Sequence, residues 1–580
     1  MITSLKKAVS WIDTHLLVIM AGFLLAFIPL YPKLPLFEAI PGYIVRVRLE
    51  DLFVLTTAFV WLIQVIRGKV KWRTPMVWFI AAYAIVGILS LLSGIFLINT
   101  IPPELLHVGK SALHYFRYLE YFTLFLIVFS AIKSRTHVIV LLSIFSLTLI
   151  ALSLYGYGQR YYYWPVYSTM NREFSKGIRL YLTEHARVQS TFGGHYDLAA
   201  YLVIALPIVL TLAFAAKKWW LKVGLQITHW MGVWLMIMTA SRTSFLAYGV
   251  GALLVLLLWA LQQKGIPGKV WWGVSRSLFV GAMVFVLMAN YGDDMYERFL
   301  QTLEGYPQAH AFYHYWNGRK NVTLETYVYN PLIALNPFRL PEAQKPENSM
   351  STDELEDVMV ASDQRPEPIQ PSDVYVNVND IVDVASTSAD GTVTVIQVDR
   401  GPRTYSDAAL KHGLSLAIRL DTLWPQAIRG FMRNPIVGSG YATLNKESAY
   451  QFTEADSTDN NFLRTLGETG LLGFITFYGA VILALRVAFK QLRHHDLLNR
   501  ALSVGVIGAT IGLLINAIYI DVFAASKVAF AYWSMIGLLM GYVYYLKTLP
   551  PPVKLEPKKM AASYRKPSVR KVRKNLTFHE

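Results

Sequence analysis

Polar residues that can do chemistry gather between two apolar stretches, in the segment 434–473. A Pro- and Gly-rich turn leads into a polar loop that ends in Asp459, Asn460 and Asn461, and an apolar run then begins around Glu468. A carboxylate such as Asp459 can act as a general base toward a sugar hydroxyl, and the two amides can bind hydroxyl groups. Asp and Asn also favour the N-cap of a helix, and both interpretations can hold together.

Two arginines occur where an anionic group can be bound. Arg242 lies in a link of a few residues between two apolar stretches, and Arg419 lies with Trp424 in an amphipathic segment. A charged residue at a membrane span is costly and is a functional candidate. Arginine can hold a phosphate through two parallel hydrogen bonds. The alternatives are a snorkelling interface residue for Arg242 and a surface helix for Arg419.

Other polar residues stand near the ends of apolar runs. His195 and Asp197 open one run, where they either line the same site or cap a helix. Asp521 is either a cavity residue or the end of a span. Arg117 and Glu120 are three residues apart, which predicts a structural ion pair on one helix face.

Composition restricts the class of protein. Of 580 residues, 54% are hydrophobic and 16% are charged, against ~25% charged in soluble domains. The absence of cysteine excludes disulfides and thiolate chemistry. The net charge of +16 is spread over short loops and the tail, so we expect no nucleic-acid partner. His310 and His314 have metal-ligand spacing but no HExxH pattern, and we expect no metal or cofactor.

Long apolar blocks predict an all-α polytopic membrane protein with about twelve transmembrane helices, since a span takes roughly 20 residues. Lys and Arg concentrate in alternate loops, so the positive-inside rule places both termini in the cytoplasm. The expected spans are 15–32, 51–67, 76–98, 116–132, 137–155, 197–216, 219–239, 243–262, 270–290, 466–488, 502–521 and 527–546.

The chain divides by composition into four parts. Residues 1–290 hold nine expected spans and 466–546 hold three, with a large extracytoplasmic loop at 291–465 between them. Residues 547–580 form a basic cytoplasmic tail, with ten Lys or Arg against two Glu. In the loop, alternating valines around Asp390-Gly391 predict a β insert at about 370–400. An amphipathic helix is expected at 413–433, so the insert is a small α+β excursion.

Three segments resemble the O-antigen ligase and polymerase family of bacterial envelope glycosyltransferases. SRTSFLAYGVGALLVLLL (241–258) is similar to the family's Ser-Arg segment that opens a span. RLDTLWPQAIRGFMRNPIVGSGY (419–441) resembles its Arg–Trp helix followed by Pro-x-x-Gly-x-Gly. DNNFLRTLGETGLLG (459–473) resembles its His-Asn segment followed by Glu-x-Gly-Leu-Leu-Gly. The twelve-span plan with one large outer loop also fits this family.

The resemblance implies a multi-pass protein of the cytoplasmic membrane that transfers a glycan from an undecaprenyl-diphosphate carrier to a sugar hydroxyl. The acceptor is a glycan or glycolipid, and neither metal nor nucleotide takes part. Carried onto this chain, Arg242 and Arg419 bind the diphosphate. Asp459 is the base where ligases have His, and an aspartate with its usual pKa of ~3.9 is a weaker base unless burial raises that pKa. Expected substrate contacts are Asn460, Asn461, Glu468, His195 and Asp197.

Two other classes of function stay open. A transporter or flippase of lipid-linked sugars, or of another anionic substrate, also suits twelve spans and arginines in the membrane. Carriers commonly have two similar halves with interrupted spans at matching positions, and the sequence shows no such repeat. A structural envelope protein that binds through the β insert leaves Arg242 unexplained.

Overall fold

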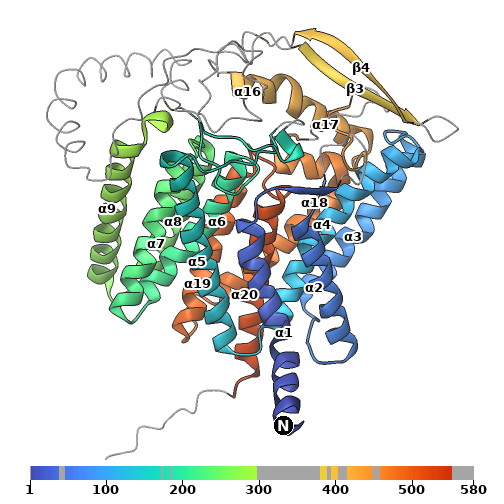
Figure 1. Ribbon diagram of the computed structural model, residues 1–580. Coiled ribbons are helices and arrows are strands. Elements are labelled where there is room, and N and C mark those ends of the chain that lie inside the picture. The colour runs from blue at the N-terminus through green and yellow to red at the C-terminus, as the bar shows by residue number, and fades with distance from the viewer. Residues whose placement is uncertain are drawn as a thin grey trace, which may run out of the picture.

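The computed structural model describes residues 2–37, 46–170, 174–182, 186–296, 379–387, 393–402, 414–446 and 457–550, with the single residues 299, 406 and 450. Long helices dominate this part of the chain and run side by side (Figure 1). Two sets of expectations fall outside it: His310 and His314, and the basic tail beyond 550.

Each of the twelve expected spans coincides with a long helix in the described part of the chain. Ten of these helices are long and apolar enough to cross a membrane, which confirms the all-α polytopic class. The other two, α4 and α7, contain more polar residues, so the count of twelve stays a prediction. The twelve are α1 (Ile2–Leu30), α2 (Leu49–Ile66), α3 (Pro75–Leu92), α4 (Leu105–Ala131), α5 (Arg135–Tyr161), α6 (His195–Ala215), α7 (Trp219–Met238), α8 (Arg242–Ala260), α9 (Ile266–Tyr291), α18 (Asn461–Lys490), α19 (Leu497–Asn516) and α20 (Ser526–Thr548).

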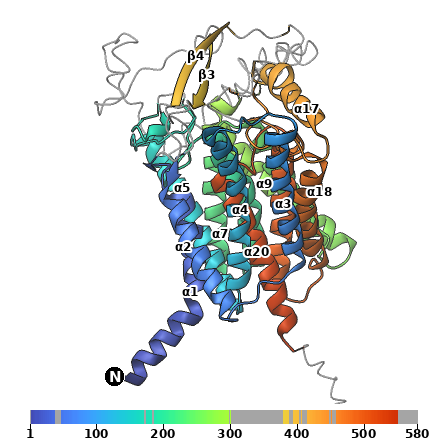
Figure 2. The ribbon, with the colours of Figure 1, turned by 90° about the vertical axis from the view of Figure 1, so that its right-hand side faces the viewer.

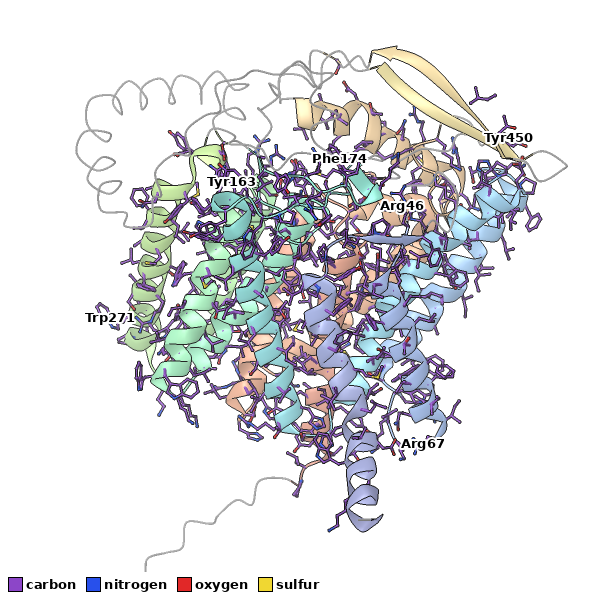
Figure 3. All side chains as sticks on the ribbon, viewed as in Figure 1. Arg46, Arg67, Tyr163, Phe174, Trp271 and Tyr450 are labelled. Carbon is purple, nitrogen blue, oxygen red and sulfur yellow. The ribbon has the colours of Figure 1, made fainter. Side chains whose placement is uncertain are left out.

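The helices form a bundle with two distinct ends. One end carries the N-terminus and the C-terminal end of α20, and we call it the terminal end (Figure 1). The opposite end, the hairpin end, carries the strands β3 (Asn379–Thr387) and β4 (Val393–Pro402), which pair antiparallel. Figure 3 shows Arg67 at the terminal end and Arg46 at the hairpin end. The short strands β1 (Pro35–Phe37) and β2 (Val47–Arg48) flank the α1–α2 linker.

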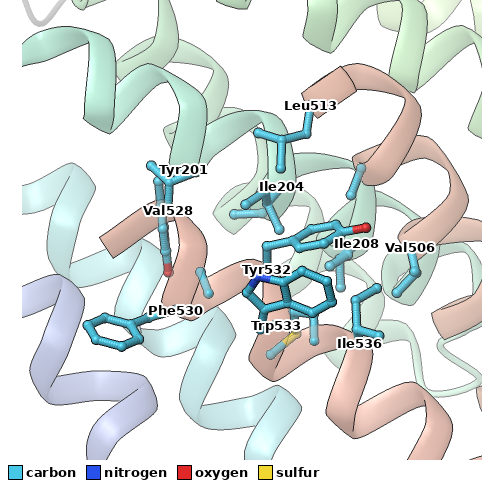
Figure 4. Packing of buried hydrophobic residues seen from close by; sticks show 14 of the residues in the cluster. Tyr201, Ile204, Ile208, Val506, Leu513, Val528, Phe530, Tyr532, Trp533 and Ile536 are labelled. Carbon is cyan, nitrogen blue, oxygen red and sulfur yellow. The ribbon is translucent and has the colours of Figure 1, made fainter. Parts of the chain in front are cut away.

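The core lies where α6, α19 and α20 meet (Figure 4). The apolar windows of α6 and α20 are both 89% buried, so these helices are central. Small residues let helices approach closely, as is common in membranes: a Cβ on Gly251 of α8 would lie 2.7 Å from the carbonyl oxygen of Gly508 in α19. By contrast α9 buries 6% of its window and exposes Trp271, so it is peripheral.

A helical run covers the hairpin end beside α18 (Figure 2). It consists of α16 (Leu414–Ile418), one π-helical turn η4 (Arg419–Leu423) and α17 (Trp424–Arg433), and it occupies the place of the expected amphipathic helix. The π-helical turn had no signal in the sequence. Such turns in α-helices occur frequently at functional sites, and this one begins at Arg419.

Candidate functional site

The polar loop before α18 forms the centre of the candidate site. Asn460 is the N-cap of α18, and its Oδ1 accepts a hydrogen bond of 3.0 Å from the backbone N–H of Leu463. This confirms the capping interpretation for Asn460. Asp459 precedes the cap with φ +49°, in the left-handed region, which Asp and Asn adopt more readily than most side chains. The loop therefore turns sharply at the one residue expected to be a base.

Asp459 forms an ion pair with Arg419. The distance from Arg419 Nη2 to Asp459 Oδ2 is 2.9 Å, and the same nitrogen donates to the Tyr519 carbonyl at 3.3 Å. The guanidinium also lies over the Tyr519 ring, 5.9 Å from its centroid, and the Trp424 ring is 6.1 Å from that ring. The π-helical turn and the α19–α20 link thus hold the arginine against the carboxylate, although these residues lie 40 and 100 positions apart in the chain.

The surroundings of Asp459 favour a basic carboxylate. Burial raises the pKa of Asp459, and the neighbouring charge of Asp521 raises it further. The charge of Arg419 and a 2.9 Å hydrogen bond from the Ser457 hydroxyl oppose this rise without cancelling it. The Asp459 side chain keeps 34% of its surface exposed, whereas Arg419 keeps 11%. A ligand can therefore reach Asp459, and the raised pKa meets the condition that the sequence set for an aspartate base.

A second ionic group lies close to this pair, and its centre is Asp521, which the sequence left open as a cavity residue or the end of a span. The Asp521 carboxylate accepts hydrogen bonds of 2.9–3.1 Å from three positions of the loop and from one arginine. The donors are the N–H and hydroxyl of Thr458, the N–H of Asn460, Nη1 of Arg464 and the Ser457 hydroxyl. The Ser457 hydroxyl lies 2.9 Å from both Asp521 and Asp459, so its one proton alternates between the two carboxylates. Asp521 therefore fixes the loop that carries Asp459.

Glu468 belongs to the same buried group. Arg464 Nε lies 3.4 Å from its carboxylate, one helical turn away, and the N–H of Ala442 donates to its Oε1 at 3.1 Å. Glu468 is 2% exposed. Its surroundings favour a structural role over the expected substrate contact. The spacing of Arg464 and Glu468 was the available signal for this pair, since residues i and i+4 share a helix face.

The two glycine motifs of the sequence are parts of one contact. α18 breaks at Gly470, whose φ is +65°, and the turn containing Gly438, with φ +78°, packs into the break. The N–H groups of Ser439 and Gly440 donate to the carbonyls of Gly467 and Glu468 at 2.9 and 3.1 Å. A Cβ on Gly438 would lie 2.4 Å from the Glu468 backbone, so only glycine fits. This contact joins α17 to α18 and sets the position of the loop between them.

Arg242 reaches the site from another pair of helices. It is the first residue of α8, after a three-residue link in which Ser241 is the N-cap. Partly buried, it is close enough to Arg419 and to Arg187 for electrostatic interaction with both. The structure thus brings together the two arginines expected from the sequence and adds a third. Arg187 had no signal, because it lies in the irregular segment between α5 and α6.

His195 and Asp197 face two different neighbourhoods. His195 Nε2 contacts the guanidinium of Arg187, which also donates to the Tyr196 hydroxyl at 3.2 Å. His195 therefore belongs to the group of arginines. Asp197 interacts electrostatically with Lys33 and other cations near the α1–α2 linker instead. The structure does not bring Asp197 together with Arg242.

Asn461 points into the protein interior. Its side chain donates to the Tyr478 hydroxyl at 3.2 Å and accepts from the N–H of Phe523 at 3.0 Å, and the residue is fully buried. These bonds connect α18 to the α19–α20 link. The geometry gives Asn461 a structural role and does not favour the expected contact with substrate. The predicted Arg117–Glu120 ion pair is present at 2.9 Å, with Asp51 as a second partner.

The arrangement combines a reachable carboxylate with a cluster of arginines at one end of a membrane bundle. A carboxylate with a raised pKa can accept a proton, and arginines can hold an anion. Within the described residues, no group of three or more His, Asp or Glu is placed to hold a metal ion. No protein-family model matches the chain, and no curated protein matches it either.

Proposed function

We propose that this chain is a glycosyltransferase that moves a glycan from an undecaprenyl-diphosphate carrier to a sugar hydroxyl, in the manner of O-antigen ligases and polymerases. The observation that carries the proposal is the 2.9 Å pair of Arg419 and the partly exposed Asp459, with Arg242 within electrostatic range. The family's three motifs supply these residues, and they come from segments far apart in the chain.

The proposed location is the cytoplasmic membrane, with both termini in the cytoplasm and the reaction on the outer face. The distribution of charge supports this orientation. The links after α2, α4, α6, α8 and α18 lie at the terminal end, because successive helices run in opposite directions (Figure 1). These links carry the basic residues of the short loops, and such residues favour the cytoplasmic side. The Asp459 loop lies at the opposite end.

In the proposed reaction, Asp459 accepts the proton of an acceptor hydroxyl, and the hydroxyl oxygen forms a bond to the anomeric carbon of the donor sugar. The bond from that carbon to the diphosphate oxygen breaks, and its electron pair leaves with undecaprenyl diphosphate. Arg242 and Arg419 stabilise the negative charge that develops on the leaving group. Because the diphosphate competes for Arg419, donor binding frees Asp459 from its ion pair before it takes the proton.

The test is turnover by purified protein in lipid nanodiscs, supplied with undecaprenyl-diphosphate-linked oligosaccharides from its host. Release of undecaprenyl diphosphate and the size of the glycan product are measured without ATP, with and without EDTA. Arg242→Ala should lower turnover by about 10²–10³, the usual effect of losing one group that stabilises developing charge. Arg67→Ala, which removes an arginine at the terminal end, is the matched control and should leave turnover unchanged.

The product distinguishes the variants of the proposal. A ladder of lengthening lipid-linked glycan identifies a polymerase, and a single transfer to an added acceptor identifies a ligase. If no acceptor condition releases lipid diphosphate, the proposal fails. Movement of the lipid-linked sugar across liposome membranes would then identify the transporter alternative.

A further inference from the structure

A second charged cluster lies at the hairpin end, around the α1–α2 linker, and the proposed reaction does not use it. We call Lys33, Arg48, Glu50, Asp197 and Lys527 the linker cluster. Lys33 Nζ lies 3.2 Å from Glu50 Oε1, and these residues are 5% and 1% exposed. Lys527 donates to the carbonyls of Pro29, Tyr31 and Thr191 at 2.7–3.0 Å. Lys33 and Lys527 are thus held in place by other protein groups.

Some polar groups of the other members are left without a hydrogen-bond partner in the described part of the chain. Within the described part of the chain, the Arg48 guanidinium makes no hydrogen bond, and its Nε is buried. Glu50 Oε2 is buried without a hydrogen-bond partner among the described residues. Asp197 is only partly buried. Yet Asp197 interacts electrostatically with Lys33, Lys527 and Arg48. Buried polar atoms without partners are costly, so a polar occupant would stabilise Arg48 Nε and Glu50 Oε2.

The tyrosine at the end of α1 adds one more such group. Tyr31 is partly buried and senses the charge of Glu50, and its hydroxyl makes no hydrogen bond within the described residues. These groups therefore comprise donors, on Arg48 and Tyr31, and acceptors, on Glu50 and Asp197. They come from the residue after α1, from β2, from the start of α2 and from the start of α6, all at the hairpin end. Figure 3 shows Arg46 of the same linker there, and its guanidinium bonds the Ser175 hydroxyl at 2.9 Å.

We propose that the linker cluster is a subsite for a sugar residue of the glycan, with Arg48 donating and Asp197 and Glu50 accepting hydrogen bonds. A sugar carries hydroxyl groups that both donate and accept, so it satisfies this mixed set. A diphosphate would meet repulsion from the carboxylates of Glu50 and Asp197, whereas an uncharged sugar can donate hydrogen bonds to them. This inference rests on the proposed function, because it assigns the occupant to a reactant of that reaction.

The subsite lies next to the proposed reaction site. His195 and Asp197 are two residues apart on the first turn of α6, which places them roughly 200° apart around the helix axis. His195 contacts Arg187 of the arginine group, and Asp197 interacts with the linker cluster. The N-terminus of α6 thus separates the two sites by one helix diameter, about 10 Å. A glycan attached at the arginine group can therefore extend into the linker cluster.

The first experiment measures binding and needs no turnover. The first probe is the host oligosaccharide, freed from its lipid carrier by mild acid. The second probe is pyrophosphate. Each is titrated into the wild-type protein and into the variants. Arg48→Ala and Asp197→Asn should each weaken oligosaccharide binding at least tenfold and leave pyrophosphate binding unchanged. Arg67→Ala and Asp13→Asn make the same changes at the terminal end and are the controls. Unchanged oligosaccharide affinity in both cluster variants overturns the subsite, as does a loss of pyrophosphate binding.

Kinetics then assign the sugar to donor or acceptor. Where wild type turns over, Asp197→Asn should raise KM for one of the two substrates and keep kcat within threefold. A rise for the donor assigns the subsite to the transferred glycan, and a rise for the acceptor assigns it to the receiving glycan. An unchanged KM for both overturns the proposal. Arg48-dependent binding of oligosaccharide by a protein without turnover would retain the subsite and reject the proposed reaction.

Discussion

The two ionic groups at the start of α18 differ in how completely the protein satisfies them. The inner group of Arg464, Glu468 and Asp521 is 2–7% exposed, and Asp521 accepts five hydrogen bonds from the protein. In the outer pair, the Asp459 side chain is 34% exposed and bonds Arg419 and one hydroxyl. A carboxylate surrounded by protein donors has no capacity left for a ligand. The comparison therefore separates groups that fix the shape of the site from groups that can react.

This difference follows from what each group has to do. A buried charge is tolerated only where partners compensate its desolvation, so the inner group holds its loop in one arrangement. A general base needs a lone pair that the substrate can reach, and its pKa should lie near the working pH. The raised pKa and partial exposure of Asp459 meet both needs. Substitutions in the outer pair should therefore affect activity, and substitutions in the inner group should affect stability.

The largest expected effect is the loss of turnover in Asp459→Asn. Asparagine keeps the shape and tolerates the positive φ of +49°, but it cannot accept the proton. Turnover should fall by about 10²–10⁴, the usual contribution of general acid–base catalysis. The thermal midpoint should stay near that of wild type. Asp13→Asn, which changes a carboxylate at the terminal end, should keep full activity. A variant that retained turnover would remove Asp459 from the chemistry.

The next effect is on stability and concerns the inner group. In Asp521→Asn one carboxylate oxygen becomes an amide nitrogen that faces donors, and Arg464 loses the nearer of its two charge partners, at 3.0 Å. Breaking a buried pair from one side costs about 3–5 kcal/mol. Unfolding in a denaturant series should show this loss, whereas Arg419→Ala should change the free energy of unfolding by much less. Equal losses in both variants would contradict the division into inner group and outer pair.

A smaller loss of stability is expected where the glycine turn meets the break in α18. In Gly438→Ala the new Cβ would lie 2.4 Å from the Glu468 backbone, at a φ of +78° that alanine rarely adopts. Strain of this kind costs about 1–3 kcal/mol, and the shift of the loop should also reduce turnover. Gly281→Ala in α9 is the control, because nothing lies within 4 Å of its added Cβ. A neutral Gly438→Ala would show that the contact is dispensable.

Much of the fold followed from the sequence, because a bilayer requires long apolar helices and their composition shows it directly. The expected span at 466–488 shows why the ends of helices differ from those expected. The helix begins five residues earlier, at Asn461, and breaks at Gly470. Arg464 precedes the expected span and hid the first turn from a hydropathy pattern, whereas Glu468 lies inside that span. They are tolerated there because they pair with each other and with Asp521.

The candidate site could be predicted in its residue types but not in its partners. Asp459 and Arg242 are polar residues beside apolar runs, and Arg419 is a basic residue in an amphipathic segment, so each is a candidate from the sequence alone. Their grouping depends on contacts between segments far apart in the chain, such as Arg419 with Tyr519, and no local pattern encodes these. For the same reason Asp197 was grouped with His195 from their spacing, although the two face different clusters.

The smallest expected effect is a shift in the pH dependence of turnover, which tests whether Asp459 of the outer pair is the group that takes the proton. Burial raises the pKa of Asp459, so turnover should fall on the acid side at a pH above the ordinary aspartate range. The hydroxyl of Ser457 donates to this carboxylate at 2.9 Å and holds its pKa down. Ser457→Ala removes that bond from the charged form, so the pKa of Asp459 rises further and the acid limb moves to higher pH. Ser153→Ala, whose hydroxyl bonds only its own helix, should leave the profile in place. Loss of the Ser457 hydrogen bond can only raise the pKa of Asp459. If the acid limb of the Ser457→Ala profile moved to lower pH instead, a group other than Asp459 would be the one that takes the proton.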